Sequence, residues 1–143
     1  MKTSRSELRE KIMIILYQIY MYRKDNINYD INSVIKENIS IENQFVNTMV
    51  FNVLEKEKEI DNIINKYMKD WIITRLGNID QAILRMSTYE LLYMDTPPIV
   101  SINEGIELSK RYSDDKVTKL INGVLDAILD NEVKDEWKCL FKC

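Results

Sequence analysis

Apolar side chains recur at helical spacing along almost the whole chain. The first series is Leu8, Ile12, Ile15 and Ile19, at intervals of four, three and four residues. This spacing places the four side chains on one face of an α-helix. Ser4 and Glu7 have the spacing of a capping box, so we expect this helix to begin at Ser4 and to fade near residues 24–26.

Further helical series follow, separated by short polar breaks. The first two are a short helix around Ile31, Val34 and Ile35 and a helix from Ser40 with a stripe of Phe45, Met49 and Val53. Two more are expected from Ile60 to Tyr67 and from Ile79 to Leu92. A further helix opens with a second capping box of Ser101 and Glu104, and the last runs from Val117 to Ile128. The breaks include the charged run 55–59, Gly77–Asn78 and Pro97–Pro98. Because no stretch alternates as a strand does, the pattern predicts an all-α bundle of about seven helices.

Length and composition fit one globular domain that needs no metal. The chain has 143 residues, of which 45% are hydrophobic and 30% charged. The apolar run from Ile12 to Tyr17 is too short to span a bilayer, and Glu7 and Glu10 argue against a signal peptide. We therefore expect a soluble cytoplasmic protein without a membrane segment.

Most catalytic chemistry is missing from the sequence. Histidine is absent and glycine occurs three times, which excludes histidine-based triads and metal sites and leaves no glycine-rich phosphate loop. We expect no enzyme activity, no cofactor and no metal. Cys139 and Cys143 are interpreted as reduced thiols on a terminal segment, with a two-thiolate metal site completed by a dimer as the alternative.

The positive charges are unevenly distributed. The net charge of −3 argues weakly against a nucleic-acid binder, but Lys2, Arg5 and Arg9 crowd the start of the first helix, and Lys116 and Lys119 begin the last one. Cations at a helix start oppose the helix dipole. The pattern raises the hypothesis that the two starts lie side by side as an anion-contacting edge, with Tyr17 near for base stacking. The alternative is a solvated N-terminus with Tyr17 against the core.

Several motifs in order resemble the NusB family. They are Leu8–Glu10 through Leu16–Tyr17, then Trp71–Leu76, Ile79–Arg85, Tyr89–Leu91, Pro98–Glu104, Ile106–Leu108 with Lys110, and Lys119–Asp126. The resemblance implies two small helical bundles packed together. It also implies binding of the boxA element of nascent single-stranded RNA, mostly as a heterodimer with the ribosomal protein NusE, within the RNA polymerase antitermination complex on ribosomal RNA operons.

The resemblance also assigns roles to residues by position. RNA contacts fall on Lys2, Arg5, Arg9, Tyr17, Lys116 and Lys119, and a contact to NusE falls on Asp80. We expect Arg5→Glu combined with Arg9→Glu to abolish boxA binding while the free energy of unfolding stays within about 0.5 kcal/mol.

Some positions depart from the family pattern. Leu120 stands where a phenylalanine is expected, and Gly105 replaces alanine at a cost of about 1 kcal/mol in helix propensity. Asn122–Gly123 is interpreted as a close approach of two helices. We divide the chain into a NusB-like domain, residues 1–130, and a C-terminal amphipathic tail, residues 131–143, which carries Val133, Trp137, Leu140 and Phe141.

Two other functions stay open. One is a helical protein adaptor that binds no RNA. The other is a NusB-like module of the kind fused to RNA cytosine methyltransferases, although this chain shows no cofactor-binding α/β domain. A homodimer is possible beside the monomer.

Overall fold

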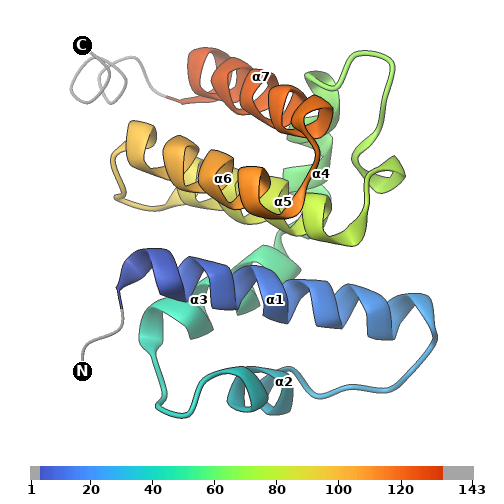
Figure 1. Ribbon diagram of the computed structural model, residues 1–143, viewed down its shortest axis with the longest axis vertical. Helices are drawn as coiled ribbons and strands as arrows, with labels where there is room; N and C mark the ends of the chain where they lie inside the picture. The colour runs from blue at the N-terminus through green and yellow to red at the C-terminus, as the bar shows by residue number, and fades with distance from the viewer. Residues whose placement is uncertain (1–3, 134–143) are drawn as a thin grey trace.

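The computed structural model describes residues 4–133, and within that range the chain forms seven α-helices, one short 3-10 helix and no strand (Figure 1). Their bounds are α1 Arg5–Lys24, α2 Ile31–Asn38, α3 Gln44–Glu55, α4 Glu57–Lys66, η1 Ile73–Arg75, α5 Asn78–Tyr93, α6 Pro98–Tyr112 and α7 Asp115–Glu132. The predicted all-α class and number of helices are confirmed. The expected tail helix, with Trp137 and Cys139, lies outside the described residues.

The helices form two packed groups (Figure 1). Helices α1, α2 and α3 make one, and α4 to α7 make the other. Helix α5 packs against α1 and α3 on one side and against α4, α6 and α7 on the other. Every residue from Gln81 to Leu91 of α5 is therefore buried, and this helix is the shared centre of both bundles.

Most helix starts follow from their capping residues. The Ser4 hydroxyl accepts a hydrogen bond from the Glu7 amide at 3.1 Å, as the capping box predicts. The third helix begins at Gln44 and not at Ser40, because the Asn43 side chain accepts from the Val46 amide.

The expected capping box at Ser101 is wrong. Helix α6 begins three residues earlier, at Pro98, because proline at a first helical position lacks only an amide hydrogen that the helix does not use. The Ser101 hydroxyl is buried and has no hydrogen-bond partner among residues 4–133. Glu104 instead accepts a hydrogen bond from Ser6 of α1 at 2.6 Å.

Close helix packing occurs at Gly105, not at Gly123. A Cβ at Gly105 would lie 2.4 Å from the Ser87 Oγ of α5, so alanine here would force the Ser87 side chain or the facing helix to shift, and the lost helix propensity of glycine is offset by close packing. A Cβ at Gly123 would meet nothing within 4 Å, and Asn122 is exposed. The prediction of a close approach at Asn122–Gly123 is therefore wrong.

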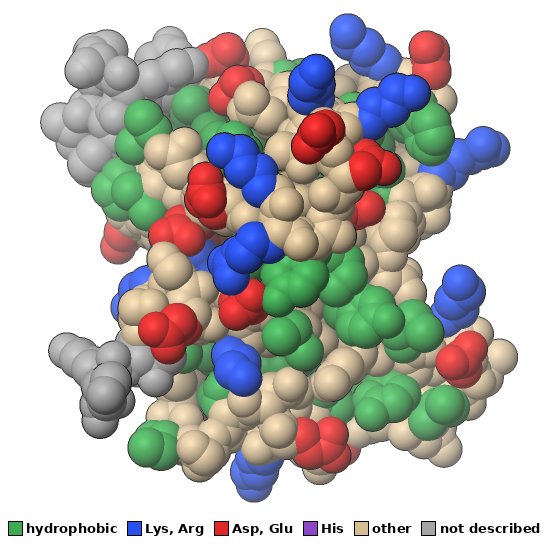
Figure 2. All heavy atoms as spheres, in the orientation of Figure 1, with side chains coloured by type: hydrophobic (Ala, Val, Ile, Leu, Met, Phe, Trp, Pro, Cys, Tyr) green, Lys and Arg blue, Asp and Glu red, His purple; other side chains and the backbone are tan. Residues whose placement is uncertain are grey.

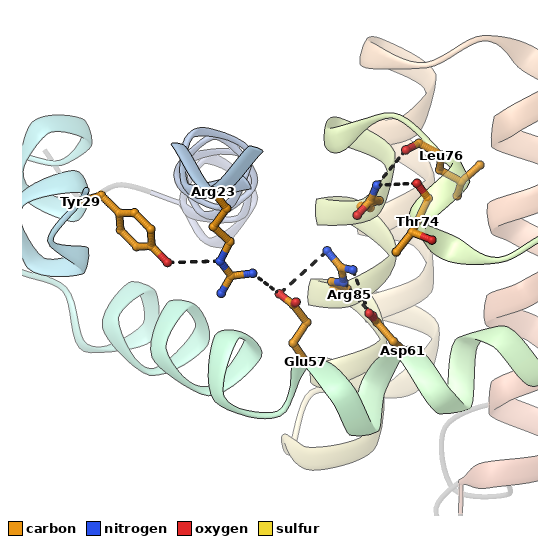
Figure 3. Close-up of polar contacts among 8 residues, drawn as sticks. Arg23, Tyr29, Glu57, Asp61, Thr74, Leu76 and Arg85 are labelled. Carbon is orange, nitrogen blue, oxygen red and sulfur yellow. Dashed lines mark hydrogen bonds and ion pairs between the residues drawn. The ribbon is translucent and has the colours of Figure 1, made fainter. Parts of the chain in front are cut away.

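A polar network joins the two bundles at the end of α1 (Figure 3). The Glu57 carboxylate of α4 lies between two guanidinium groups, 2.8 Å from Arg23 Nη1 of α1 and 3.9 Å from Arg85 Nη1 of α5. Arg85 also makes a bidentate contact with Asp61, at 2.7 and 2.9 Å. Burial opposes the charge of Arg85, but the hydrogen bonds to Asp61 and the electrostatic effect of the nearby Tyr20 raise its pKa above the ordinary value. This network fixes the orientation of α1 relative to α4 and α5.

Candidate nucleic-acid and protein interfaces

Arg5 presents a free guanidinium group at the start of α1. Its Cζ lies 4.0 Å from the centre of the Phe45 ring of α3, which holds the planar group in a stacked position. The side chain is exposed and has no carboxylate partner among residues 4–133. Its hydrogen-bond donors are therefore available to an anion.

Arg9, one turn further along, is in a different environment. It is 5% exposed, and its Nε and Nη2 donate to the two Glu90 carboxylate oxygens at 3.0 and 2.5 Å. Burial alone would lower the pKa of Arg9, but the hydrogen bond and charge of Glu90, together with Glu104, raise it above its ordinary value. The structure therefore places Arg9 in the interface between α1 and α5.

This burial contradicts one expectation. The variant Arg9→Glu would place a second carboxylate against Glu90, which is 2% exposed, so its free energy of unfolding would not stay near the wild-type value. Arg5, which is exposed and free of carboxylates, is the residue that tests RNA binding without this loss. Lys2 lies outside the described residues.

The two basic helix starts do not lie side by side. Ser6, beside Arg5, contacts Glu104 near the start of α6, whereas α7 begins just after the other end of α6, at Ser113–Asp114. Figure 1 shows the start of α1 and the start of α7 at opposite sides of the molecule. The hypothesis of one continuous edge built from both starts is therefore wrong.

Lys119 belongs to a second basic surface that the sequence analysis missed. It lines a groove of about 440 Å³ between α4 and α7 together with Lys66 and Lys69, and the floor of the groove is formed by Leu120 and Val124. Lys116 is exposed one turn before Lys119. In Figure 2 the Lys and Arg side chains gather, among acidic ones, where α7 begins. Lys66 ends α4 and Lys69 lies in the turn after it, so no periodicity in the sequence links them to Lys119, and only the fold brings the three together.

Tyr17 lies well away from Arg5. Twelve residues separate them on α1, which is about 18 Å along the axis. On α1, the side chains of Glu10, Tyr17 and Met21 lie along one stripe of the helix surface. The Glu10 carboxylate accepts a hydrogen bond from the Tyr112 hydroxyl at the end of α6 at 2.6 Å. Met21 Sδ accepts a hydrogen bond from the Asn78 side chain at the start of α5 at 3.1 Å. Tyr17 is half-buried on this stripe, and Figure 2 shows a band of apolar side chains over the second half of α1.

Asp80 lies in the first turn of α5, in the same part of the molecule. Its carboxylate accepts a hydrogen bond from the Ser113 hydroxyl, at the junction of α6 and α7. Burial raises the pKa of Asp80, the bond from Ser113 lowers it, and the nearby Asp114 raises it again, so that the net shift is upward. The residues predicted for RNA thus separate: Arg5 lies at one end of α1, and Tyr17 lies with Asp80 near the other.

Neither a metal-holding cluster nor a membrane-spanning helix is found within residues 4–133. Among residues 4–133 no group of three or more Asp, Glu, Cys or His side chains is arranged to hold a metal ion. Of the helices in this range, none has the length and apolar character that a membrane crossing requires.

The structure defines a small all-α protein of two packed helical bundles, with exposed cations and a separate apolar band on its surface. The sequence model of the NusB family matches residues 6–130. The chain belongs to the NusB family, a family of transcription antitermination factors and not of enzymes.

The relatives agree with this assignment. The transcription antitermination protein NusB of Staphylococcus aureus (strain JH9) is 42% identical over 126 residues, which are 87% of this chain and 98% of that protein. The structure of NusB from T. maritima superposes with a TM-score of 0.84 at 31% identity, covering 96% of this chain and 98% of that one.

A second similar structure contains partners. NusB in a crystal structure of antitermination factors NusB and NusE with double-stranded RNA superposes with a TM-score of 0.72 at 28% identity, covering 88% of this chain and 96% of that one.

Proposed function

We propose that this protein binds single-stranded boxA RNA together with NusE and so promotes processive transcription of ribosomal RNA operons in the cytoplasm. Membership of the NusB family supports the proposal, as does the similarity to a NusB chain crystallised with NusE and RNA. The observation that carries the RNA contact is the exposed Arg5 guanidinium, stacked on Phe45 and free of carboxylates within residues 4–133.

Arg5 suits phosphate for a physical reason. A guanidinium group presents planar donors that match phosphate oxygens, and stacking on Phe45 lowers the entropy lost when it binds. Lys2 and Arg9, from the same helix start, and Lys116 and Lys119, at the start of α7, are proposed as further RNA contacts. Arg9 would act mainly by holding the helix start in place through Glu90.

We propose the stripe with Tyr17 and Asp80 as the docking surface for NusE. A half-buried tyrosine beside an apolar band and a carboxylate suits a protein interface, where aromatic side chains dominate the buried centre. Asp80 gives this surface a negative charge that suits a basic ribosomal protein. Tyr17, assigned to RNA by the resemblance, would on this arrangement contact NusE as well.

A gel-shift titration tests the RNA contact. The full chain is titrated against boxA RNA and a scrambled RNA, with and without NusE, and then as Arg5→Gln. We expect preference for boxA that strengthens with NusE, and an affinity about tenfold lower for Arg5→Gln, since charged hydrogen bonds contribute about 1.5–3 kcal/mol. The log–log salt slope should also become shallower by about 0.7, as for one lost phosphate contact on a single strand.

Arg75→Gln is the matched control. Arg75 is an exposed arginine in η1 with no ion-pair partner among the described residues, so its replacement should leave RNA affinity within twofold. If Arg5→Gln retains wild-type RNA affinity, the RNA contact at Arg5 is overturned. If NusE binds but the wild-type chain binds boxA RNA no better than scrambled RNA, the adaptor that binds no RNA is favoured instead.

A further inference from the structure

A cavity of about 570 Å³ lies directly beside Arg5. Its walls come from the start of α1, from Thr48 of α3, from Tyr89 and Tyr93 at the end of α5, and from the connection that contains Asp95. Small-molecule sites occupy about 300–1,000 Å³, so the space is large enough for a nucleobase with its sugar. Arg5 and Arg9 line the cavity and are assigned to RNA, but no role has been assigned to its tyrosines or to Asp95.

One wall of the cavity is aromatic. The Tyr89 and Tyr93 rings are 5.2 Å apart between centres, and Tyr93 is 42% exposed. Both rings are held in position, because the Tyr89 hydroxyl accepts from Asn52 at 2.8 Å and the Tyr93 hydroxyl donates to Glu59 at 3.2 Å. Tyr89 is only 5% exposed and supports Tyr93 from behind, and the Lys56 ammonium group lies 4.9 Å from the centre of the Tyr93 ring. A fixed, partly exposed aromatic ring such as Tyr93 is the kind of surface on which single-stranded bases stack.

Two charged groups of opposite sign in the cavity lining, Arg5 and Asp95, have no ion-pair partner among residues 4–133, whereas Arg9, which also lines it, is paired with Glu90. Arg5 offers donors at the rim, and the exposed Asp95 carboxylate has no hydrogen-bond or ion-pair partner among residues 4–133. A carboxylate repels phosphate but accepts hydrogen bonds from the N–H groups of a base edge. The arrangement therefore separates a phosphate contact at Arg5 from a base contact at Asp95.

We propose that this cavity holds one unstacked guanine base of a single-stranded RNA. The base would stack against Tyr93, its phosphate would contact Arg5, and its ring N–H and exocyclic amino group would donate to the two Asp95 carboxylate oxygens. Guanine fits because it presents two adjacent donors, whereas uracil presents one. This inference rests on the proposed RNA-binding function and specifies which part of the RNA the start of α1 reads.

Two labelled oligonucleotides test the proposal by fluorescence anisotropy at low salt, with the full chain in the presence and absence of NusE. One is an octamer of uridine, and the other is the same octamer with a single central guanosine. We expect wild-type protein to bind the guanosine octamer about tenfold more tightly, as for one bidentate base contact.

Three variants separate stacking from hydrogen bonding. Tyr93→Leu should weaken binding of the guanosine octamer about tenfold, while Tyr93→Phe, which keeps the ring, should bind as wild type. Asp95→Asn should lose the preference for guanosine without weaker binding of the uridine octamer. The controls are Tyr112→Leu, another half-exposed tyrosine bonded to a carboxylate, and Asp70→Asn, another exposed loop aspartate. They are compared in the absence of NusE, because Tyr112 bonds to Glu10 on the stripe proposed for NusE.

The outcomes distinguish this proposal from the proposed function. Thermal unfolding shows whether Tyr93→Leu and Asp95→Asn are folded. If these folded variants bind RNA as wild type does while Arg5→Gln binds it more weakly, the cavity does not hold a base, but RNA binding by the start of α1 stands. If wild-type protein binds neither octamer nor boxA RNA, with or without NusE, both proposals are overturned.

Discussion

Arg5 and Arg9 lie one helical turn apart on α1 and have different physical roles. The Arg5 guanidinium group is exposed and lies over the Phe45 ring, whereas the Arg9 guanidinium group donates two hydrogen bonds to Glu90 in the interface with α5. The sequence carried a signal for this difference. Arg9 flanks the apolar stripe of its helix, and Glu90 shares a helix face with Ile83 and Met86, so each is a charge among apolar side chains that needs a partner. Their pairing across 81 residues needed the fold.

At this scale we predict that Arg9→Gln lowers the free energy of unfolding by about 3–5 kcal/mol, because it leaves the buried Glu90 carboxylate without its cation. Urea unfolding followed by circular dichroism measures the change. Arg5→Gln, the control on the same helix, should stay within about 0.5 kcal/mol.

A second variant distinguishes loss of the ion pair from loss of packing. Replacing both partners, Arg9→Met with Glu90→Met, removes the uncompensated charge and should recover at least half of the loss. A stability of Arg9→Gln equal to that of Arg5→Gln would mean that the pair between α1 and α5 does not hold the helix start.

At the scale of helices, periodicity located all seven helices but placed some of their boundaries and contacts wrongly. A helix with one buried face carries apolar residues at a regular spacing that can be seen in a single sequence. The buried residues of α5 and α7 therefore follow from the pattern. Several neighbouring residues can each start a helix, and the sequence does not say which of them does. Helix α6 begins at Pro98, although Ser101 and Glu104 have capping-box spacing. The glycine at a close contact cannot be distinguished from the glycine at an open surface without the facing helix.

The contact of α5 with α6 yields a prediction at this scale. Gly105→Ala should lower the free energy of unfolding by about 1–3 kcal/mol through overpacking against Ser87, although alanine is the better helix former. Adding Ser87→Ala removes the atom that would lie 2.4 Å from the new Cβ and should restore most of the stability.

Urea unfolding of the two single variants and the double variant gives the coupling energy. The control is Gly123→Ala on α7, where the space is open, and this change should raise stability by up to about 1 kcal/mol. Equal effects of alanine at both glycines would contradict the close packing of α5 against α6.

At the scale of the whole molecule, the fold distributes the predicted site residues over different surfaces. Arg5 and the aromatic cavity lie at the start of α1, Tyr17 and Asp80 lie near the start of α5, and Lys119 joins Lys66 and Lys69 between α4 and α7. Motif order indicated the family and the residues. It could not indicate which residues share a surface, because helix starts that look equivalent in sequence lie at opposite sides of the fold.

The central claim is that the RNA contact at the start of α1 and the NusE surface around Tyr17 and Asp80 are separate surfaces of this chain. Nuclear magnetic resonance of the isotopically labelled full chain, titrated separately with boxA RNA and with NusE, tests it most directly. We predict that RNA shifts the amide signals of Arg5, Tyr93 and Asp95, whereas NusE shifts those of Tyr17, Asp80 and Ser113. If RNA shifts only the signals around Tyr17 and Asp80 and leaves Arg5 unchanged, the account is contradicted.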